Sequence, residues 1–220
     1  GFLVNSLAAQ ITLLEKYPFK IGEIGTYDAI YQWGFIEIRA GEVQFEIQKL
    51  VEGSDSLFHF KSIGNSKPKY DWIYTVRDTF QSKVYTHHFL PKYYQRKTSE
   101  GNYSVLNTIF FDYDQHSIHM ELSNSEKGSQ TKTMAYEEGI YDLQTAVYYA
   151  RFLDFENAFM GEEYKFTVII DGMLYQIPIR YEGKEMIQLS DETSYNCYRI
   201  STQVIEGTIF KSHQTIKIWV

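Results

Sequence analysis

Apolar and polar residues alternate along most of the chain with the period of two that half-buried β-strands have. The clearest example runs from Tyr164 to Ile170, reaches Asp171-Gly172, and continues as a second alternating run from Met173 to Ile179. Asp-Gly between two alternating runs is the strongest short-range signal for a two-residue hairpin. The sequence therefore predicts an antiparallel hairpin centred on Asp171-Gly172.

The same alternation predicts strands over most of the remaining chain. Strands are expected over Tyr27 to Trp33 and near Tyr70 to Val76, and a hairpin is expected to turn at Ala40-Gly41. Asn124 to Thr131 is polar throughout and predicts the longest loop. Polar loops are predicted at Glu52 to Ser56 and Gly64 to Lys69, and turns at Ser99 to Asn102, Asp112 to Ser117, Glu182 to Lys184 and Asp191 to Ser194. Glu206-Gly207 precedes a final expected strand that contains Phe210, Ile216 and Ile218. About a dozen antiparallel strands with short turns predict an all-β fold, a partly open or closed β-barrel.

One stretch, Asp142 to Leu153, has helical periodicity instead. Its apolar residues at helical spacing are Leu143, Ala146, Val147 and Ala150, and tyrosines at 148 and 149 cover most of the remaining surface. The Asp142 carboxylate can cap the helix by accepting from amides of the first turn. A helix that is apolar nearly all round is normally buried. The sequence therefore predicts one short helix that packs against, or plugs, a large β structure.

The N-terminal residues 1–10 predict a segment outside the fold. After Gly1 comes an apolar piece followed by small residues, with Ser6 and Ala8 suited to the positions before a signal-peptide cleavage site. This segment is interpreted as a signal-peptide remnant or an added N-terminus, and residues 11–220 as a single β-barrel-like domain. The interpretation predicts an exported protein of the periplasm or cell envelope. No later run reaches the roughly 18 apolar residues of a membrane span.

Composition narrows the classes of partner. The 220 residues carry a net charge of −7, which argues against binding to nucleic acid or to an anionic membrane surface, both of which favour basic patches. Cys197 is the single cysteine, so the chain has no intrachain disulfide and no cysteine-rich metal site. Its place in an alternating strand predicts a buried, inert thiol. The aromatic share of 17% fits strand packing, with a smaller part left to line a cavity.

Candidate catalytic chemistry is sparse. His116 and His119 have Asp112 and Asp114 nearby, but strand residues three apart face opposite sides, so a metal site is not expected. His87-His88 diverge for the same reason if they lie on a strand. The acidic pairs Glu137-Glu138 and Glu162-Glu163 are interpreted as solvated loop charges. No phosphate loop, dinucleotide fingerprint or nucleophile elbow is present, so neither catalytic residues nor cofactors are predicted.

Arg151 is the most suggestive single residue, because a guanidinium on an apolar helix must find a partner. One interpretation is a structural anchor that holds the helix to a carboxylate or to strand carbonyls. The other is an anion clamp at a cavity mouth that uses the planar fork of donors. In that case Tyr148 and Tyr149 line the same site, so these three residues are the candidate ligand-binding set.

Several short motifs together resemble a known family. The first motif is Gly22-Glu23-Ile24 with Tyr27, and the second is Asp78, Phe80, Ser82 and Val84 followed by Leu90-Pro91. The third is Asp142-Leu143 with Tyr148-Tyr149-Ala150-Arg151, and the last is Gly207 and Phe210 with Ile218-Trp219-Val220. The chain resembles exported bacterial proteins that are grouped as a domain of unknown function with a YmcC-like, partly open β-barrel. The resemblance implies an envelope location and a barrel, and it supplies no catalytic residues.

Three functional hypotheses follow. The first is a non-enzymatic envelope protein that binds an apolar or amphipathic ligand, such as a lipid or lipid-linked glycan, or an envelope protein partner. The second is a hydrolase that acts on envelope lipid or polysaccharide, which requires a histidine or carboxylate pair with perturbed pKa values in a cleft. The third is a structural or adhesive scaffold module, which a broad exposed apolar patch would favour. The sequence leaves the oligomeric state open.

Overall fold

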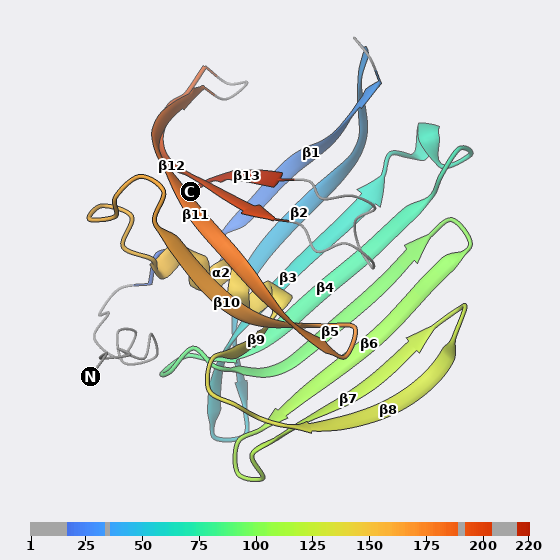
Figure 1. Cartoon of the computed structure of the whole chain (residues 1–220). Coiled ribbons are helices and arrows are strands. Elements are labelled where there is room, and N and C mark those ends of the chain that lie inside the picture. The colour runs from blue at the N-terminus through green and yellow to red at the C-terminus, as the bar shows by residue number, and fades with distance from the viewer. Residues whose placement is uncertain (1–16, 34–35, 189–191, 204–214) are drawn as a thin grey trace. The chain divides into compact units, whose positions relative to one another are not determined.

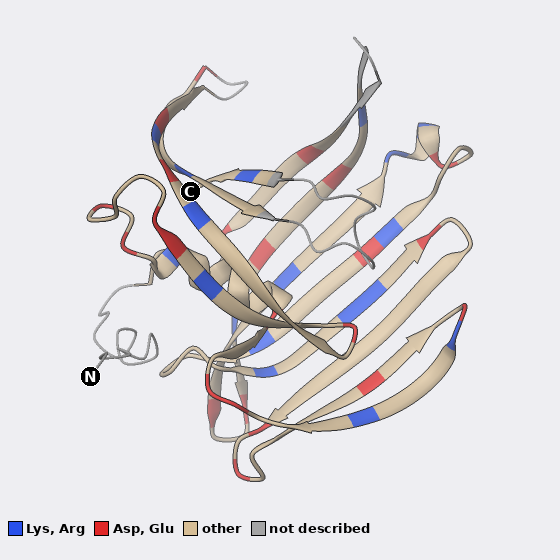
Figure 2. Cartoon of the chain, in the orientation of Figure 1, with Lys and Arg blue, Asp and Glu red and all other residues tan. Residues whose placement is uncertain are grey.

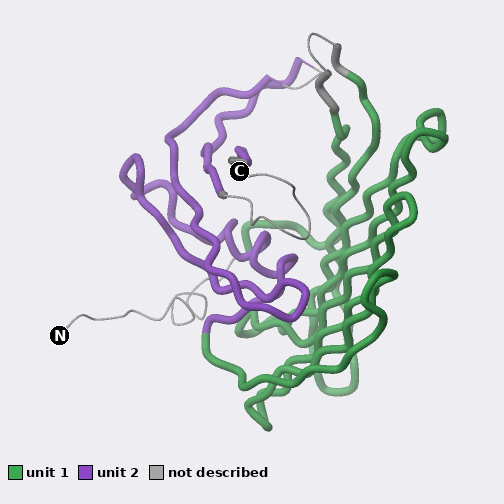
Figure 3. Tube along the Cα trace, turned by 45° about the vertical axis from the view of Figure 1, so that its right-hand side comes forward, with its two compact units in different colours: residues 1–138 green, residues 139–220 purple. Residues whose placement is uncertain are grey.

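The computed structural model describes residues 17–33, 36–188, 192–203 and 215–220. The chain divides into two compact units, unit 1 over residues 1–138 and unit 2 over residues 139–220, which Figure 3 colours separately. The prediction of one domain over residues 11–220 concerns how these units are joined and stays a prediction. The proposed signal remnant at residues 1–10 lies outside the described residues, as do Glu206-Gly207, which precede the expected final strand, and the start of the turn at Asp191.

Unit 1 is an eight-stranded antiparallel sheet in which each strand pairs with the next one along the chain (Figure 1). The connections that the structure describes are short, as in a β-meander. A short 3-10 helix, η1 (Pro68–Tyr70), lies between the third and fourth strands. The strands are β1 (Ile24–Trp33), β2 (Ile36–Glu52), β3 (Asp55–Ser66), β4 (Val76–Tyr85), β5 (Pro91–Glu100), β6 (Tyr103–Asp112), β7 (Ser117–Asn124) and β8 (Gly128–Ala135).

The hairpin predicted at Ala40-Gly41 is wrong, because β2 runs through this dipeptide without turning. Gly41 pairs with Ala29 of β1 and with Ser66 of β3, and the β1–β2 register shifts between Ala29 and Ile30. A Cβ atom at position 41 would lie 2.7 Å from the carbonyl oxygen of Asn65. The glycine therefore marks a close approach of two backbones beside a β-bulge, which is the other common use of glycine in strands.

Three other predicted boundaries in unit 1 also differ from the structure. The loop expected over Gly64 to Lys69 begins only after Ser66, because β3 continues to that residue. The strand expected over Tyr70 to Val76 is absent there, since these residues leave η1 through a turn and enter β4 only at Val76. The polar loop expected over Asn124 to Thr131 ends at Gly128, where β8 begins. β8 is an edge strand of its sheet and is almost entirely exposed, so its polar composition does not prevent it from pairing.

The buried face of the unit 1 sheet is apolar toward one end of the strands and polar further along them. The apolar part holds Ile47, Phe58, Phe60, Val84, Ile109, Ile118 and Met120, and Phe19 and Phe89 pack on Phe58 and Phe60. Two residues further along the strands, the same face carries the buried polar residues Ser62, Arg96 and Asn107, and buried Ser82 pairs directly with Phe60. The Arg96 guanidinium lies over the Phe80 ring and its Nε donates to Thr98 Oγ1 at 3.1 Å. Packing dominates one part of this face and polar pairing the other.

Unit 2 is a five-stranded sheet with the order β13-β12-β11-β10-β9. Its pairs are antiparallel except β9 with β10, which is parallel. The hairpin predicted at Asp171-Gly172 is confirmed, with φ of 49° and 77° at the two turn residues, as a two-residue turn of this hand requires. The elements are β9 (Ile140–Asp142), α2 (Leu143–Tyr149), η2 (Ala150–Phe152), β10 (Glu163–Ile170), β11 (Met173–Gln188), β12 (Ser194–Gln203) and β13 (Thr215–Trp219).

The turn predicted at Glu182 to Lys184 is wrong, because β11 continues to Gln188. Gly183 has a φ of 106°, and the β11–β12 register shifts between Tyr181 and Gly183. A glycine in this left-handed region permits a β-bulge that bends the strand without ending it. On β12, Cys197 is half-buried, so the fully buried thiol expected from the alternation is not found.

The predicted helix is confirmed but is shorter than the sequence suggested, since α2 ends at Tyr149 and continues only as the 3-10 turn η2. Asp142 caps it as predicted, with Oδ1 accepting from the Thr145 amide at 2.9 Å and Oδ2 from the Thr145 hydroxyl at 2.6 Å. Val147, expected in the core, is largely exposed, whereas Tyr148 and Tyr149 are buried. The helix packs on β9 and β10 of its own unit.

The prediction of an all-β chain with one short helix is confirmed. The described residues form thirteen strands, and in them neither sheet closes on itself, as in the partly open form of the prediction. Within these described ranges, none of the helices has the length and apolar character that crossing a membrane requires.

Candidate binding groove

A solvent-open groove of about 740 Å³ lies on unit 2, a volume within the range of small-molecule sites. Its walls come from the segment that precedes β10 and from β11 and β12. Acidic and basic segments lie close together on β10 and β11 (Figure 2). Residues that line the groove include Met160, Glu163, Arg180, Tyr181, Arg199 and Ser201.

Strand register places the polar lining residues in one row. Glu163 of β10 pairs with Arg180 of β11, and Arg180 pairs with Ser201 of β12. Directly paired residues point to the same face of a sheet, so these three side chains are neighbours across three strands. At the side of this row, Thr202 Oγ1 donates to the Pro178 carbonyl oxygen at 2.8 Å and holds β12 to β11.

Two glycines give side chains room to lie over the backbone. A Cβ atom at Gly161 would lie 3.3 Å from Nη2 of Arg180, and one at Gly183 would lie 3.2 Å from Cε of Met160. Both glycines have positive φ, 91° and 106°, which side chains rarely tolerate. The Met160 side chain therefore covers the β11 bulge, and with the neighbouring Phe159 it exposes an apolar rim.

The segment before β10 is held to β11 by an extension of the β-ladder. The Gly161 amide donates to the Tyr181 carbonyl at 2.8 Å, and the Tyr181 amide donates to the Glu162 carbonyl at 2.9 Å. The Tyr181 ring is buried and stacks on Phe155 with ring centroids 5.7 Å apart. This wall of the groove is therefore ordered by backbone pairing and by aromatic packing.

Arg199 is the firmly paired cation of the groove. Its Nη1 donates to Glu185 Oε2 at 3.1 Å, and Nε lies 3.1 Å from Glu182 Oε2 without forming an aligned hydrogen bond. Glu185 also accepts from the indole of Trp219 at 2.9 Å. That hydrogen bond and the Arg199 guanidinium hold the pKa of the Glu185 carboxyl below its ordinary value. Two carboxylates thus fix Arg199 in place, and the Trp219 indole holds one of them.

Arg180 is the loosely paired cation. Its Nη1 lies 4.0 Å from Glu163 Oε1, and the two side chains are 58% and 46% exposed. An ion pair this long and this exposed contributes little to stability, because water screens it and both side chains keep their freedom. The Arg180 guanidinium can therefore turn toward an incoming anion at little cost to the fold.

The candidate ligand-binding residues from the helix lie elsewhere in unit 2. Tyr148 and Tyr149 are buried, and the Tyr149 ring packs against Tyr141 at 5.0 Å and Phe166 at 5.6 Å. Burial raises the pKa of the Tyr149 hydroxyl to about 12. Arg151 is half-buried in η2. None of the three lines the groove, and their role in ligand binding stays a prediction.

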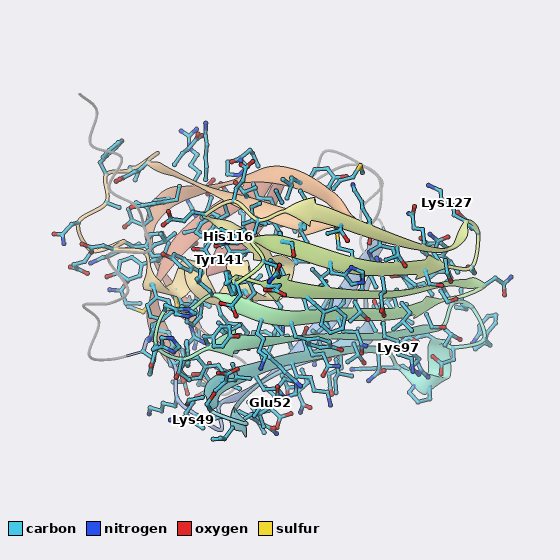
Figure 4. The ribbon with its side chains drawn as sticks, turned by 90° about the horizontal axis from the view of Figure 1, so that it is seen from below. Lys49, Glu52, Lys97, His116, Lys127 and Tyr141 are labelled. Atoms are coloured by element: carbon cyan, nitrogen blue, oxygen red, sulfur yellow. The ribbon has the colours of Figure 1, made fainter. Side chains whose placement is uncertain are left out.

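The histidines form no metal site in the parts of the chain that the structure describes, where no group of three or more His, Cys, Asp or Glu side chains could hold an ion. His116 lies in the β6–β7 turn, at the opposite end of β7 from Lys127 (Figure 4), and His119 Nδ1 contacts Thr133 Oγ1 at 3.1 Å. His87 and His88 were expected to diverge on a strand. They lie in the β4–β5 turn instead, with ring centroids 4.0 Å apart.

The sequence patterns did not predict the groove, because they do not show which residues of different strands become neighbours. Glu163 was interpreted as a solvated loop charge, and it is in fact the first residue of β10. Arg180 and Arg199 both follow apolar alternation, which indicates a strand but not which outward charges become neighbours. The available signal was the confirmed hairpin at Asp171-Gly172, since its register brings Glu163 opposite Arg180.

The sequence also places the chain within a family. Residues 26–220 match the family described as protein of unknown function, DUF3108. The chain belongs to this family. No curated protein and no solved structure matches it. The DUF3108 description assigns no ligand, so the function is argued from the groove.

Unit 1 carries a half-buried carboxylate that the groove does not use. Burial, with a smaller effect from the nearby Glu100, raises the pKa of Asp78 to about 6, and Oδ1 has no hydrogen-bond partner among the described residues. A folded-state pKa above the ordinary 3.8 means that the associated stability is present below pH 3.8 and is lost as the pH rises through about 6.

We therefore expect Asp78→Asn to raise the free energy of unfolding by about 1–2 kcal/mol at pH 8, after allowance for the partial exposure of the site. The gain should vanish at pH 4, where the wild-type carboxyl is already neutral in the folded state. Urea unfolding at both pH values measures the effect, with the exposed turn residue Asp114→Asn as the matched control. Equal gains at the two pH values would contradict the expectation.

Proposed function

We propose that this DUF3108 protein is a non-enzymatic protein of the cell envelope that binds an amphipathic molecule with an anionic group in the unit 2 groove. The observation that carries the proposal is the loosely paired Arg180 in an open groove of about 740 Å³. An arginine presents five N–H donors in a planar fork that matches a carboxylate or a phosphate. Because its partner Glu163 is exposed, Arg180 can turn its guanidinium to a ligand without leaving a buried carboxylate unpaired.

The rim of the groove suits the apolar part of such a molecule. Met160 and the neighbouring Phe159 are largely exposed, and Pro178 adds apolar surface to the lining of the groove. Methionine adapts to irregular apolar surfaces, because its side chain is unbranched and polarisable. A ligand with its anionic group at Arg180 and its hydrocarbon part on Met160 uses both kinds of surface.

A hydrolytic function finds less support in the same groove. Hydrolysis by a side-chain nucleophile requires that group and a base within hydrogen-bond reach of each other in one cleft. Among the described residues that line the groove are the hydroxyls of Ser201 and Thr202 but no histidine. His87 and His88 belong to the β4–β5 turn of unit 1. The groove geometry therefore favours binding over hydrolysis.

The proposal predicts that Arg180→Ala weakens binding of a fluorescent long-chain fatty acid by about tenfold, and that Arg180→Lys weakens it less. Titration of the purified protein followed by fluorescence measures the change. Arg39→Ala is the matched control, since Arg39 is also exposed and pairs with a carboxylate, Asp28, at 3.3 Å. The control should bind as the wild type does.

Native mass spectrometry of protein purified from its own envelope fraction provides an independent test. A discrete extra mass that is lost on denaturation and reduced in Arg180→Ala supports the proposal and reveals the ligand class. Equal fatty-acid affinity of Arg180→Ala and wild type would rule out the groove as the binding site. Absence of the protein from the envelope fraction would refute the proposed location.

A further inference from the structure

Unit 1 holds three consecutive large apolar side chains in solvent. Trp72, Ile73 and Tyr74 lie in the turn between η1 and β4 and are 83%, 63% and 52% exposed. Single exposed apolar residues are common on protein surfaces, but a contiguous group indicates an interaction site. We call residues 72–74 the aromatic tip.

The base of the turn is ordered by a polar network centred on Asp71. Ser66 Oγ donates to Asp71 Oδ1 at 2.5 Å, and Arg77 Nη2 donates to Asp71 Oδ2 at 2.5 Å. Thr75 Oγ1 donates to the Asp71 carbonyl at 3.0 Å. The hydrogen bonds from Arg77 and Ser66 hold the pKa of the Asp71 carboxyl below its ordinary value, so the network stays charged near neutral pH.

Backbone hydrogen bonds fix the tip itself. The Ile73 and Tyr74 amides donate to the Tyr70 carbonyl at 2.9 and 3.2 Å, and the Gly101 amide donates to the Thr75 carbonyl at 2.8 Å. The exposed side chains are therefore presented by a structured turn. A binder that is already ordered loses less conformational entropy when it docks.

Cationic side chains flank the tip although the whole chain has a net charge of −7. Lys67 and Lys69 precede it and Arg77 follows it. Lys67 and Arg77 are paired with Asp28 and Asp71, whereas the Lys69 ammonium lies 4.7 Å from the centre of the Tyr70 ring. Lys69 thus places a positive charge over the half-buried Tyr70 ring, which precedes the tip by two residues.

We propose that the aromatic tip docks the protein on a phospholipid surface, with Trp72 and Ile73 among the headgroups and Lys69 beside their phosphates. Trp and Tyr concentrate at membrane–water interfaces, where an amphipathic ring meets both media. Nearby lysines add attraction to anionic lipids. The proposal does not depend on the groove in unit 2.

The size of the tip favours a lipid surface over a protein partner. Three such side chains bury roughly 500 Å² at most. A stable protein interface needs roughly 800 Å² from each partner. A bilayer accepts a small insertion, because the lipids close around it and each buried apolar group contributes separately.

The test is flotation of the full chain with vesicles of phosphatidylcholine and phosphatidylglycerol. The wild type should float with the vesicles, and the double variant Trp72→Ser with Ile73→Ser should lose at least about tenfold in partitioning. Val51→Ser is the matched control, because Val51 is an equally exposed apolar residue at the end of β2. Its partitioning should remain that of the wild type.

A charge variant separates insertion from attraction. Lys69→Glu should reduce binding to the mixed vesicles more than binding to pure phosphatidylcholine. Equal partitioning of the wild type and the double variant, or no flotation of the folded wild type, would overturn the proposal. Dimerisation of the wild type that the double variant abolishes, without vesicle binding, would also overturn it and identify the tip as a self-association surface.

Discussion

Replacing Phe60 with alanine is expected to lower the free energy of unfolding by about 3–5 kcal/mol, the largest stability loss predicted for this protein. Phe60 is fully buried on the unit 1 sheet, and its ring contacts Phe19, Phe58 and Phe89 at centroid distances of 5.6, 5.9 and 5.8 Å. Truncation removes these contacts and leaves a cavity that three rigid rings cannot fill. Urea unfolding monitored by circular dichroism measures the loss.

The matched control for this cavity is Val51→Ala, since Val51 lies at the exposed end of β2. Surface substitutions of this kind usually change stability by less than about 0.5 kcal/mol. Phe60→Leu keeps part of the side-chain volume, so its loss of stability should lie between the losses of Val51→Ala and Phe60→Ala. A loss below about 1 kcal/mol for Phe60→Ala would show that the aromatic cluster is not the core of unit 1.

Acidification is expected to destabilise the protein through His88 by about 1–2 kcal/mol between pH 7 and pH 4.5, after allowance for the partial exposure of the ring. Burial, with a smaller effect from the neighbouring His87, lowers the pKa of the His88 imidazole to about 4, and Nδ1 has no hydrogen-bond partner among the described residues. The unfolded chain binds this proton near the ordinary pKa of 6.5. The stability is therefore present above pH 6.5 and is lost as the pH falls toward about 4.

Comparison with His88→Phe isolates this effect from the protonation of carboxylates. Phenylalanine keeps a ring beside Tyr85, whose ring centroid lies 5.0 Å from that of His88, and it cannot take a proton. The variant should lose about 1–2 kcal/mol less than the wild type between the two pH values, as measured by urea unfolding. His116→Asn is the control, since His116 is exposed in a turn with a φ of 48° that asparagine tolerates. Parallel losses in all three proteins would contradict the prediction.

Local patterns were sufficient where the chain interacts with itself over a few residues. Alternation with Asp171-Gly172 predicted the β10–β11 hairpin, because the turn conformation depends on those two residues alone. Asp142 predicted the start of α2 for the same reason, since its carboxylate caps an amide three positions away. The all-β class with one short helix followed from many such local signals.

Glycine shows where local reasoning failed. Gly41 and Gly183 were both expected to end strands, yet both lie within long strands at bulges. At Gly41 the reason is the carbonyl of Asn65 on the neighbouring strand, a contact between residues far apart in sequence. The residue type indicates only that a side chain is excluded, and the tertiary structure decides whether a turn or a close approach excludes it.

By itself, the sequence determined the strand-rich class, the hairpin at Asp171-Gly172, the cap of α2 and the membership in DUF3108. The tertiary structure alone decided which charges meet in the groove. Arg180 faces Glu163 and Ser201 only because three strands pair in one register, and its weak ion pair depends on a separation of 4.0 Å. Pairing between distant strands sets such distances, and a one-residue slip would turn these side chains to the other face of the sheet.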